Sequence, residues 1–299
     1  MALDKIVSSR WGPSIGFSLL RIVPRGLAYK IGSALAKQMM GDKQSAMARA
    51  IRANQAVIRN RPYADPELDH VVDAVLESTS RSIVDSFKTI ASGSEAVRKA
   101  CDVSDQILEN VSRLQEESGI VIVGPHMVGL DMFISYMGAV GFPSLGLSYP
   151  DPKGSYVAQN KLRRRFGFNI IPVSLKSLRQ AVQRLKANGV VVTAVDRPGL
   201  GGDQMQFFGK DVILPIGHAR LALKARAKLL VAIPYVGEDG IYRAEMSDPI
   251  EPKSSGTEHE IAKAMAQEAL SAMEPYIRKW PDKWMMFHAL WPDVIPSDL

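Results

Sequence analysis

The chain has 299 residues, of which 46% are hydrophobic, and this is enough for one large domain with a substantial buried core. Its 37 lysines and arginines outnumber its 31 acidic residues, and the net charge of +6 favours an anionic partner such as phospholipid headgroups, nucleic acid or a phosphorylated substrate. The single cysteine, Cys101, excludes an intramolecular disulfide, and the first residues lack the pattern of a signal peptide, so we expect a reducing, cytoplasmic setting.

A basic amphipathic segment is predicted near the N-terminus. Apolar residues recur there at every fourth position: Leu27, Ile31, Leu35 and Met39. Lys30 and Lys37 lie off this stripe, and Arg21 and Arg25 add positive charge before it. We expect residues 1–40 to lie on an anionic membrane surface, although an ordinary surface helix docked on the core would show the same pattern.

Helical patterns continue to about residue 117. We predict helices over residues 45–59, 66–89 and 104–116, with Ser104 as the N-cap of the third. No convincing strand occurs in this part of the sequence, so the sheet is expected to begin after it.

From Gly119 the pattern changes to short β-branched or apolar runs. Strands are predicted at residues 119–123, 144–148, 169–173, 189–195, 229–236 and 241–246. The last two form a hairpin across Gly237–Gly240. Residues 132–150 are the only uncharged stretch long enough to span a membrane, but their glycines and prolines predict a buried helix, a turn and a strand.

Helices fill the gaps between these strands: residues 128–140, the segment from Leu178 to Leu185 and the basic residues 217–228. Gly189 is the predicted C-cap of the second. A capping box of Thr257 and Glu260 opens the last helix, which Pro275 should kink or end. The fold class is therefore α/β: a mixed central β-sheet flanked by helices, with a helical N-terminal region on the membrane surface. Residues 41–299 are expected to form one domain.

His126 and Asp131 stand in Gly124-Pro-His-Met-Val-Gly-Leu-Asp131, directly after the most apolar strand candidate and at the start of a predicted helix. Such a corner brings side chains out at the carboxyl end of a strand, beside free backbone N–H groups, where α/β folds bind ligands. His288 and Asp293 repeat the spacing, but His288 lies in an aromatic and apolar run that is typical of packing. The placement therefore favours His126.

The chemistry of acyl transfer gives this pair a reason. A hydroxyl that attacks an acyl thioester needs a base to remove its proton as the new bond forms, and neutral imidazole suits this step. A carboxylate fixes the imidazole tautomer and stabilises the imidazolium. No nucleophilic side chain is needed, in agreement with a lone Cys101 and with no Gly-x-Ser-x-Gly motif. By themselves these residues also fit a helix cap at His126 and a solvated acid at Asp131.

Several short motifs occur in the order in which one family carries them: His126-x4-Asp131, Asn160-Lys-Leu-Arg-Arg-Arg-Phe-Gly-Phe-Asn-Ile170, Asn188-Gly-Val-Val-Val-Thr-Ala-Val-Asp-Arg197, Phe207-Phe-Gly209, Pro215-Ile-Gly-His-Ala-Arg-Leu-Ala222, Ile277-Arg-Lys-Trp-Pro-Asp-Lys-Trp284 and Trp291-Pro-Asp293. Over about residues 115–293 the chain thus resembles the bacterial late acyltransferases of lipid A synthesis, in the lysophospholipid acyltransferase superfamily. Mycobacterial phosphatidylinositol mannoside acyltransferases are among their relatives.

The resemblance implies an enzyme that moves a fatty acyl chain from acyl-CoA or acyl carrier protein to a hydroxyl of a membrane glycolipid. It implies that His126 and Asp131 form the catalytic pair and that no covalent intermediate occurs. Many lipid A members carry a membrane-spanning N-terminal helix, whereas this chain shows only an amphipathic segment. The acceptor therefore stays open among lipid A precursors, mannosylated phosphatidylinositol and lysophospholipids.

Two further pairs receive roles from the resemblance. Arg163 or Arg164 would stabilise the thioester oxyanion or bind the donor. Asp196 and Arg197 match an Asp-Arg or Asp-Gln pair after a buried strand, which implies support of the catalytic pair or binding of the acceptor. Without the resemblance, the arginines fit a solvated cluster and Asp196 fits a turn.

The expected partners are the thioester donor, the lipid acceptor and an anionic membrane surface. The protein is expected to lie peripherally on the cytoplasmic face of the cell membrane. We expect no cofactor, no metal and no nucleic acid.

Four other functions compete with this one. A glycerophospholipid or lysophospholipid acyltransferase would share the His-x4-Asp motif, but its usual Gly-rich, Arg-containing block is missing. A noncatalytic lipid-binding protein would bind the thioester without consuming it. The basic residues 217–228 would suit a nucleic-acid surface, but aromatic residues are few and no nucleic-acid motif occurs. A metallohydrolase would need more ligands beside His126 than the remote His70, His218 and His259 supply.

Overall fold

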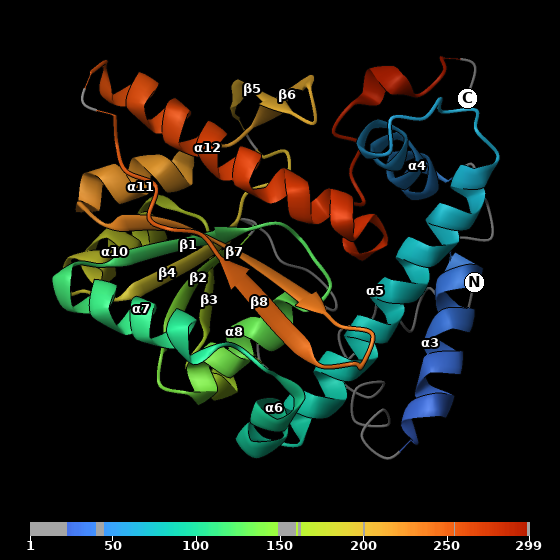
Figure 1. Ribbon diagram of the computed structural model, residues 1–299, viewed down its shortest axis with the longest axis horizontal. Helices are drawn as coiled ribbons and strands as arrows, with labels where there is room; N and C mark the ends of the chain where they lie inside the picture. Colours follow the sequence, from blue (N-terminus) through green and yellow to red (C-terminus); the bar gives the residue numbers. More distant parts are fainter. Residues whose placement is uncertain are drawn as a thin grey trace.

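The computed structural model describes residues 23–39, 45–148, 160, 163–199, 201–253 and 255–297. Within these residues a six-stranded sheet forms the centre of the molecule, and helices cover both of its faces (Figure 1). The predicted α/β class with a mixed central sheet is confirmed. Residues 1–22 and 40 of the predicted membrane-surface segment lie outside the described residues.

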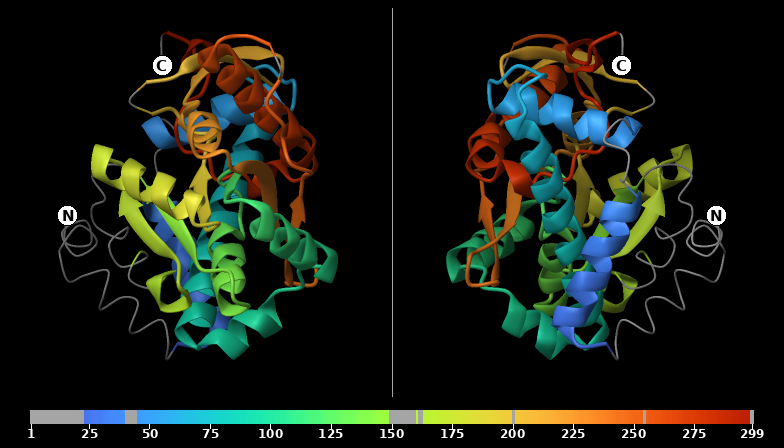
Figure 2. Two further views of the ribbon diagram at one scale, coloured as in Figure 1. Left: turned by 90° about the vertical axis from the view of Figure 1, so that its left-hand side faces the viewer. Right: turned by 90° about the vertical axis from the view of Figure 1, so that its right-hand side faces the viewer.

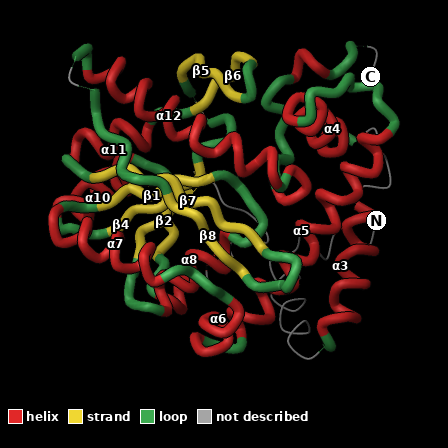
Figure 3. Tube along the Cα trace, viewed as in Figure 1, coloured by secondary structure: helices red, strands yellow, loops and turns green. Residues whose placement is uncertain are grey.

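The strands of the central sheet lie side by side, drawn yellow in Figure 3. Five of them are parallel and the sixth is antiparallel. In spatial order they are β3 (Asn169–Pro172), β2 (Ser144–Ser148), β4 (Val190–Ala194), β1 (Ile120–Gly124), β7 (Lys228–Val236) and β8 (Tyr242–Met246). β8 runs against β7 because the short turn after Val236 returns the chain directly beside it. All six strands were predicted from their β-branched and apolar runs.

The central strand β1 is buried on both faces, and its side chains alternate between two layers of helices. Val121 and Val123 face one layer, and Ile120 and Ile122 face the other. The first layer contains α10 (Leu175–Lys186), α11 (Gly217–Ala225) and α12 (Glu258–Lys279). The second contains α7 (Asp105–Glu117) and α8 (Leu130–Ala139). Burial on both faces explains why β1 is a continuous apolar run.

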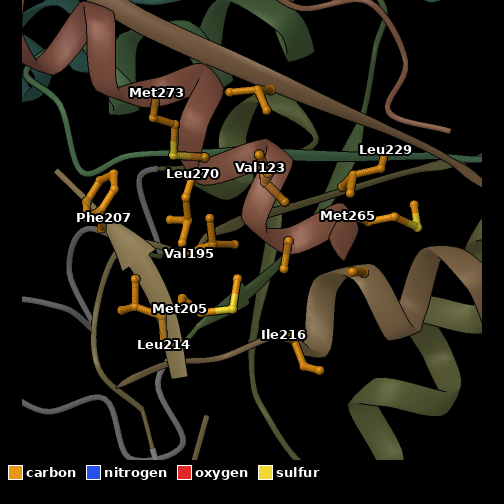
Figure 4. Close-up of a cluster of buried hydrophobic side chains, with 14 of the residues drawn as sticks. Val123, Val195, Met205, Phe207, Leu214, Ile216, Leu229, Met265, Leu270 and Met273 are labelled. Carbon is orange, nitrogen blue, oxygen red and sulfur yellow. The ribbon is translucent and has the colours of Figure 1, made fainter. Parts of the chain in front are cut away.

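The larger core lies between the sheet and α12. Figure 4 shows Val123 and Leu229 of the sheet near Met265, Leu270 and Met273 of α12. All five side chains are fully or almost fully buried, and burial of each such side chain contributes about 1.5–3 kcal/mol to folding. This packing fixes the sheet against the helix that leads into the C-terminal segment.

A second, two-stranded sheet was not predicted. It is the hairpin of β5 (Asp203–Phe207) and β6 (Lys210–Leu214). Phe208 and Gly209 form its turn with φ angles of 55° and 76°, a geometry that usually takes Asn or Gly at both positions. The backbone N–H of Phe208 donates to Glu274 Oε1 of α12 at 2.7 Å. A tertiary contact therefore supports a turn that the local sequence does not indicate.

The predicted C-cap of α10 at Gly189 is wrong, because the helix ends at Lys186 and its C-cap is Ala187. Asn188 takes the left-handed conformation, with φ of 54°. Gly189 is needed for a different reason, because a Cβ atom there would lie 2.8 Å from the carbonyl oxygen of Arg184. Asparagine tolerates the left-handed region better than other residues with a Cβ, which explains why Asn188 can take the left-handed position after the helix that was expected for Gly189.

Helix α12 begins as predicted and ends later than predicted. Thr257 and Glu260 form the capping box, so this prediction is confirmed. Pro275 was expected to kink or end the helix, and of these two effects the end does not occur, because the helix continues to Lys279. Ile277, beyond the proline, is fully buried against the core, and this packing outweighs the lost backbone hydrogen bond.

Four helices make up the N-terminal part of the described chain: α3 (Arg25–Met39), α4 (Ala46–Ile58), α5 (Glu67–Ala91) and α6 (Ser94–Ala100). α3 lies along α5, as the two side views show (Figure 2). The Tyr29 hydroxyl of α3 donates to Asp85 at 2.5 Å, and Tyr242 of β8 donates to the same carboxylate at 3.3 Å. Asp85 thus joins both helices to the sheet.

The outer face of α3 is partly apolar. Leu27 and Ile31 are 51% and 42% exposed, beside the exposed Arg25 and Lys30. The helix itself is confirmed over Arg25–Met39, and Leu27 and Ile31 of the predicted stripe share its outer face, whereas the side chains of Leu35 and Met39 lie outside the described part. None of the helices in the described ranges is both long and apolar enough to cross a bilayer.

The first prediction concerns Gly138 of α8. A Cβ atom there would lie 1.8 Å from the carbonyl oxygen of Phe166, so Gly138→Ala must push the helix away from that backbone. We expect a loss of about 1–3 kcal/mol in the free energy of unfolding, measured by urea denaturation. Gly26→Ala in α3 is the matched control, because nothing lies within 4 Å of its Cβ position. Equal stability of the two variants would contradict the close approach of α8 to Phe166.

Candidate active site

The register between β1 and β4 brings two side chains together at the carboxyl edge of the sheet. Gly124, the last residue of β1, pairs with Ala194, the last residue of β4. Because the strands are parallel, the residues two positions further on leave the sheet side by side. These residues are His126 and Asp196, which are 70 positions apart in the sequence.

Asp196 holds the His126 turn by two hydrogen bonds. His126 Nδ1 lies 2.6 Å from Asp196 Oδ1, and the backbone N–H of His126 donates to Asp196 Oδ2 at 2.8 Å. The carboxylate is fully buried, whereas the imidazole is 26% exposed. The histidine ring is therefore fixed on its inner side and open on its outer side.

Trp284 supplies a third donor to the same carboxylate. Its indole N–H donates to Asp196 Oδ2 at 2.7 Å. Burial by itself would raise the pKa of Asp196, but the charge of His126 and the hydrogen bonds from His126 and Trp284 outweigh it and lower that pKa below its ordinary value. Asp196 therefore remains a carboxylate at neutral pH.

This arrangement determines the tautomer of the histidine. A carboxylate can only accept hydrogen bonds, so Nδ1 of His126 must carry the proton that points at Asp196. In the neutral ring the lone pair then lies on Nε2. A base with a buried, charged partner and an exposed edge is suited to take a proton from a bound hydroxyl.

Asp131 lies in the first turn of α8 and makes a different ion pair. Arg163 Nε donates to Asp131 Oδ1 at 2.6 Å, and Arg163 also donates to Asn160 Oδ1 at 3.1 Å. The structure thus pairs Asp131 with Arg163, and Asp196, rather than Asp131, with the His126 ring. The reason is the sheet register, which places Asp196 under the ring and leaves the helix residue Asp131 facing the Arg163 segment.

The other two predicted arginines differ in their surroundings. Arg164 directs a guanidinium N–H to the carbonyl oxygen of Ile170 on β3, at 3.4 Å. Arg197 directly follows Asp196 and lies close to His288. His288 is only partly covered, and this partial loss of solvent lowers its pKa; the positive charges of Arg197 and His126 lower that pKa further.

The sequence interpretation missed the segment that contains Trp284 and His288. The run from Trp284 to Trp291 was expected to pack, and both tryptophans are indeed 1% exposed. His288 is instead exposed and lies within electrostatic range of His126. No local spacing indicates this proximity, because it depends on the return of the C-terminal segment to the sheet edge.

The remaining titratable candidates lie elsewhere. Burial lowers the pKa of His218 to about 4, although a hydrogen bond with the Pro215 backbone opposes the shift. His259 Nε2 lies 2.9 Å from Asp203 Oδ1 at the surface. Within the described ranges no three His, Cys, Asp or Glu side chains are grouped so that they could hold a metal ion.

Comparisons with known proteins agree with the resemblance drawn from the motifs. The family described as bacterial lipid A biosynthesis acyltransferase matches residues 6–292, almost the whole chain. A phosphatidylinositol mannoside acyltransferase from Mycolicibacterium smegmatis (strain ATCC 700084 / mc(2)155) is 25% identical over 292 residues. The match covers 94% of this chain and 90% of that protein.

The second prediction concerns Cys101, which follows α6 and is buried. Burial raises the pKa of the Cys101 thiol to about 12. Since the thiolate is the reactive form, the native protein should resist iodoacetamide at pH 8, whereas the urea-unfolded protein should react fully. Intact-mass measurement counts the added groups. Fast alkylation of the native protein would contradict the burial.

Proposed function

Because the chain belongs to the bacterial lipid A biosynthesis acyltransferase family, we propose that His126 and Asp196 form the general-base pair of its reaction. The chain is an acyltransferase, and its acceptor is a lipid. The observation that carries the proposal is the 2.6 Å contact between His126 Nδ1 and a fully buried carboxylate at the carboxyl edge of the sheet. The proposal differs from the first expectation by giving the partner role to Asp196.

The proposed step is direct transfer from an acyl thioester to a lipid hydroxyl. The hydroxyl oxygen attacks the thioester carbonyl carbon while His126 Nε2 takes the hydroxyl proton. The carbon–sulfur bond then breaks, and the imidazolium returns the proton to the leaving thiolate. The products are an ester and a free thiol, so no covalent acyl-enzyme is needed.

Asp196 supports this step electrostatically. As the proton arrives, the ring becomes an imidazolium whose positive charge lies 2.6 Å from a carboxylate that water cannot reach. Such an interaction is stronger than in water because the surroundings have a low effective dielectric constant. The transition state therefore gains more from Asp196 than the neutral ground state does.

We assign the oxyanion or donor-binding role to Arg163, with Asp131 as the residue that orients it. The Arg163 side chain is 13% exposed, and its guanidinium is held by Asp131 and Asn160. A held, largely desolvated cation is suited to stabilise a developing oxyanion. Arg164 is directed to the Ile170 backbone instead, which favours a structural role for it.

The proposed acceptor is a hydroxyl of a membrane glycolipid of the mannosylated phosphatidylinositol class. The named function of the M. smegmatis relative supports this class. The proposed donor is a fatty acyl thioester of coenzyme A or of acyl carrier protein. His288 lies within electrostatic range of both Arg197 and His126, so these side chains are the proposed place for an anionic part of a substrate.

We also propose that the N-terminal region up to residue 40 is a membrane-surface segment attached to one catalytic domain, residues 41–299. The exposed Leu27 and Ile31 beside Arg25 and Lys30 support a peripheral position on the cytoplasmic face of an anionic membrane.

The third prediction tests this membrane surface by flotation with vesicles that contain phosphatidylinositol. The protein should float with them at low salt and be released at high salt, because each basic residue near an anionic surface contributes about 1 kcal/mol that salt screens. The double change Leu27→Glu and Ile31→Glu should weaken flotation. Ile213→Glu is the control, since Ile213 is 65% exposed on the distant hairpin. Equal loss in both proteins would refute the assignment to α3.

The fourth prediction ranks three active-site variants. His126→Ala should keep the fold and lower transfer about 10²- to 10⁴-fold, as expected when a general base is removed. Asp196→Asn should approach that loss, because an amide has no charge to stabilise the imidazolium and its NH2 group is a donor where the carboxylate accepts from His126 and Trp284. Asp131→Asn should cost less, since its amide oxygen can still accept from Arg163.

Transfer is measured with a long-chain acyl-CoA and phosphatidylinositol mannosides, by mass spectrometry of the lipid product. Circular dichroism checks the fold of each variant. His259→Ala is the matched histidine control, because His259 lies at the surface on Asp203. The pairing would be wrong if Asp131→Asn were as damaging as His126→Ala while Asp196→Asn kept normal activity.

A further inference from the structure

The C-terminal segment after α12 returns to the catalytic edge of the sheet and pairs with the His126 turn. The backbone N–H of Met285 donates to the His126 carbonyl oxygen at 2.7 Å, and the N–H of Val128 donates to the Lys283 carbonyl oxygen at 2.8 Å. Met127 and Trp284 form an antiparallel bridge between these two bonds. The turn that carries the proposed base is therefore not supported by its own strand and helix alone.

The same segment is held from the opposite side by Asn54 of α4. This side chain is 1% exposed. Its amide nitrogen donates to the carbonyl oxygens of Met286 and His288 at 3.2 and 2.8 Å, and its carbonyl oxygen accepts from the Leu290 N–H at 3.0 Å. A buried amide that satisfies three backbone groups fixes the path of the segment, because each group left unpaired would cost free energy.

Trp284 is the side chain through which this segment reaches the site. Its indole N–H lies 2.7 Å from Asp196 Oδ2, the oxygen that also accepts the His126 backbone N–H. The Asp196 Oδ1 atom is thereby left to the imidazole. Oδ2 therefore accepts from the His126 backbone and from the indole, and Oδ1 accepts from the imidazole.

We propose that Trp284 is a positioning residue for acyl transfer, whose indole N–H orients the Asp196 carboxylate toward the imidazole of His126. The proposal rests on the proposed function of His126 and Asp196. It adds that the two are not sufficient by themselves, because the carboxylate can rotate about its Cβ–Cγ bond once one of its oxygens loses a donor.

Trp284 touches no reacting atom in this account, so it acts only through Asp196. Loss of its N–H leaves a buried carboxylate with fewer donors, which makes that carboxylate more basic. Asp196 would then be protonated more easily, and it would also hold the imidazolium proton more tightly. With either effect, the pair of a neutral imidazole and a carboxylate is lost by protonation already at a higher pH. Both effects therefore move the acid limb of the pH–rate profile to higher pH.

The chain contains a matched control in Trp291. Trp284 and Trp291 are both 1% exposed. Their rings pack on the same two side chains, at 6.1 and 6.3 Å from Phe207 and at 6.0 and 6.2 Å from Phe208. Among the described residues, however, the Trp291 indole nitrogen has no hydrogen-bond partner. Replacement of either tryptophan by phenylalanine costs similar packing, but only Trp284→Phe removes a donor from the site.

The experiment compares Trp284→Phe with Trp291→Phe over a range of pH, with acyl-CoA and phosphatidylinositol mannosides. We expect Trp284→Phe to lower kcat about 10- to 100-fold, the effect of one lost hydrogen bond to a charged group, with KM for acyl-CoA changed less than about twofold. Its acid limb should move to higher pH. Trp291→Phe should keep the wild-type limb and kcat within about threefold.

An isosteric replacement separates the hydrogen bond from the shape of the ring. β-(3-Benzothienyl)alanine at position 284 has sulfur in place of the indole N–H and nearly the same volume. It should reproduce the loss in kcat and the shifted acid limb even if Trp284→Phe folds poorly. His288, which lies within electrostatic range of His126, and Arg197, which acts on His288, are unchanged in all these proteins, so they do not cause the shift.

Two results would overturn the proposal. The first is a benzothienyl protein whose kcat and acid limb match those of the wild type. The second is a Trp291→Phe protein that shows the same loss in kcat and the same acid limb as Trp284→Phe. His126→Ala and Asp196→Asn are measured beside them. If both of these variants kept normal rates, the proposed base pair itself would fail. If both were inactive while Trp284→Phe kept the wild-type kcat and acid limb, only the role of the tryptophan would be rejected.

Discussion

A buried carboxylate loses its hydration, and this cost must be offset by donors and by a positive charge. Asp196 is fully buried, and its donors come from the turn after β1 and from the C-terminal segment. Along the chain these two donor segments lie 70 and 88 positions from Asp196. The site therefore exists only once the sheet has its register and the C-terminal segment has returned, so the pairing of His126 with Asp196 depends on the completed fold.

The rest of the architecture meets this requirement in stages. Parallel pairing of β1 with β4 places His126 and Asp196 at one edge. α12 packs its apolar face on the sheet and delivers the C-terminal segment, which Asn54 of α4 then holds. The same edge carries the Arg163–Asp131 pair at the start of α8. In the proposed transfer from a thioester to a lipid hydroxyl, His126 is a base that is rigid on its buried side and Arg163 is a cation held by Asp131.

Much of the scaffold could be predicted from the sequence, because strands buried on both faces must be apolar over their whole length and capping residues are local. The β5–β6 hairpin could not, since the positive φ of Phe208 depends on Glu274 of α12. His126 was chosen as the candidate base from its place after β1. Its partner was not, because the spacing to Asp131 is a local pattern, whereas contact with Asp196 is set by strand register and with Trp284 by tertiary packing.

The central claim is that Asp196 fixes His126 as the Nδ1–H tautomer and leaves Nε2 free to act as the base. The direct measurement is nitrogen NMR of protein labelled with ¹⁵N-histidine at neutral pH, with the His126 signals assigned by their loss in His126→Gln. We expect a proton on Nδ1 and an unprotonated Nε2, and a disturbed Nδ1 signal in Asp196→Asn. A proton on Nε2, or a ring whose signals do not respond to Asp196→Asn, would contradict this claim.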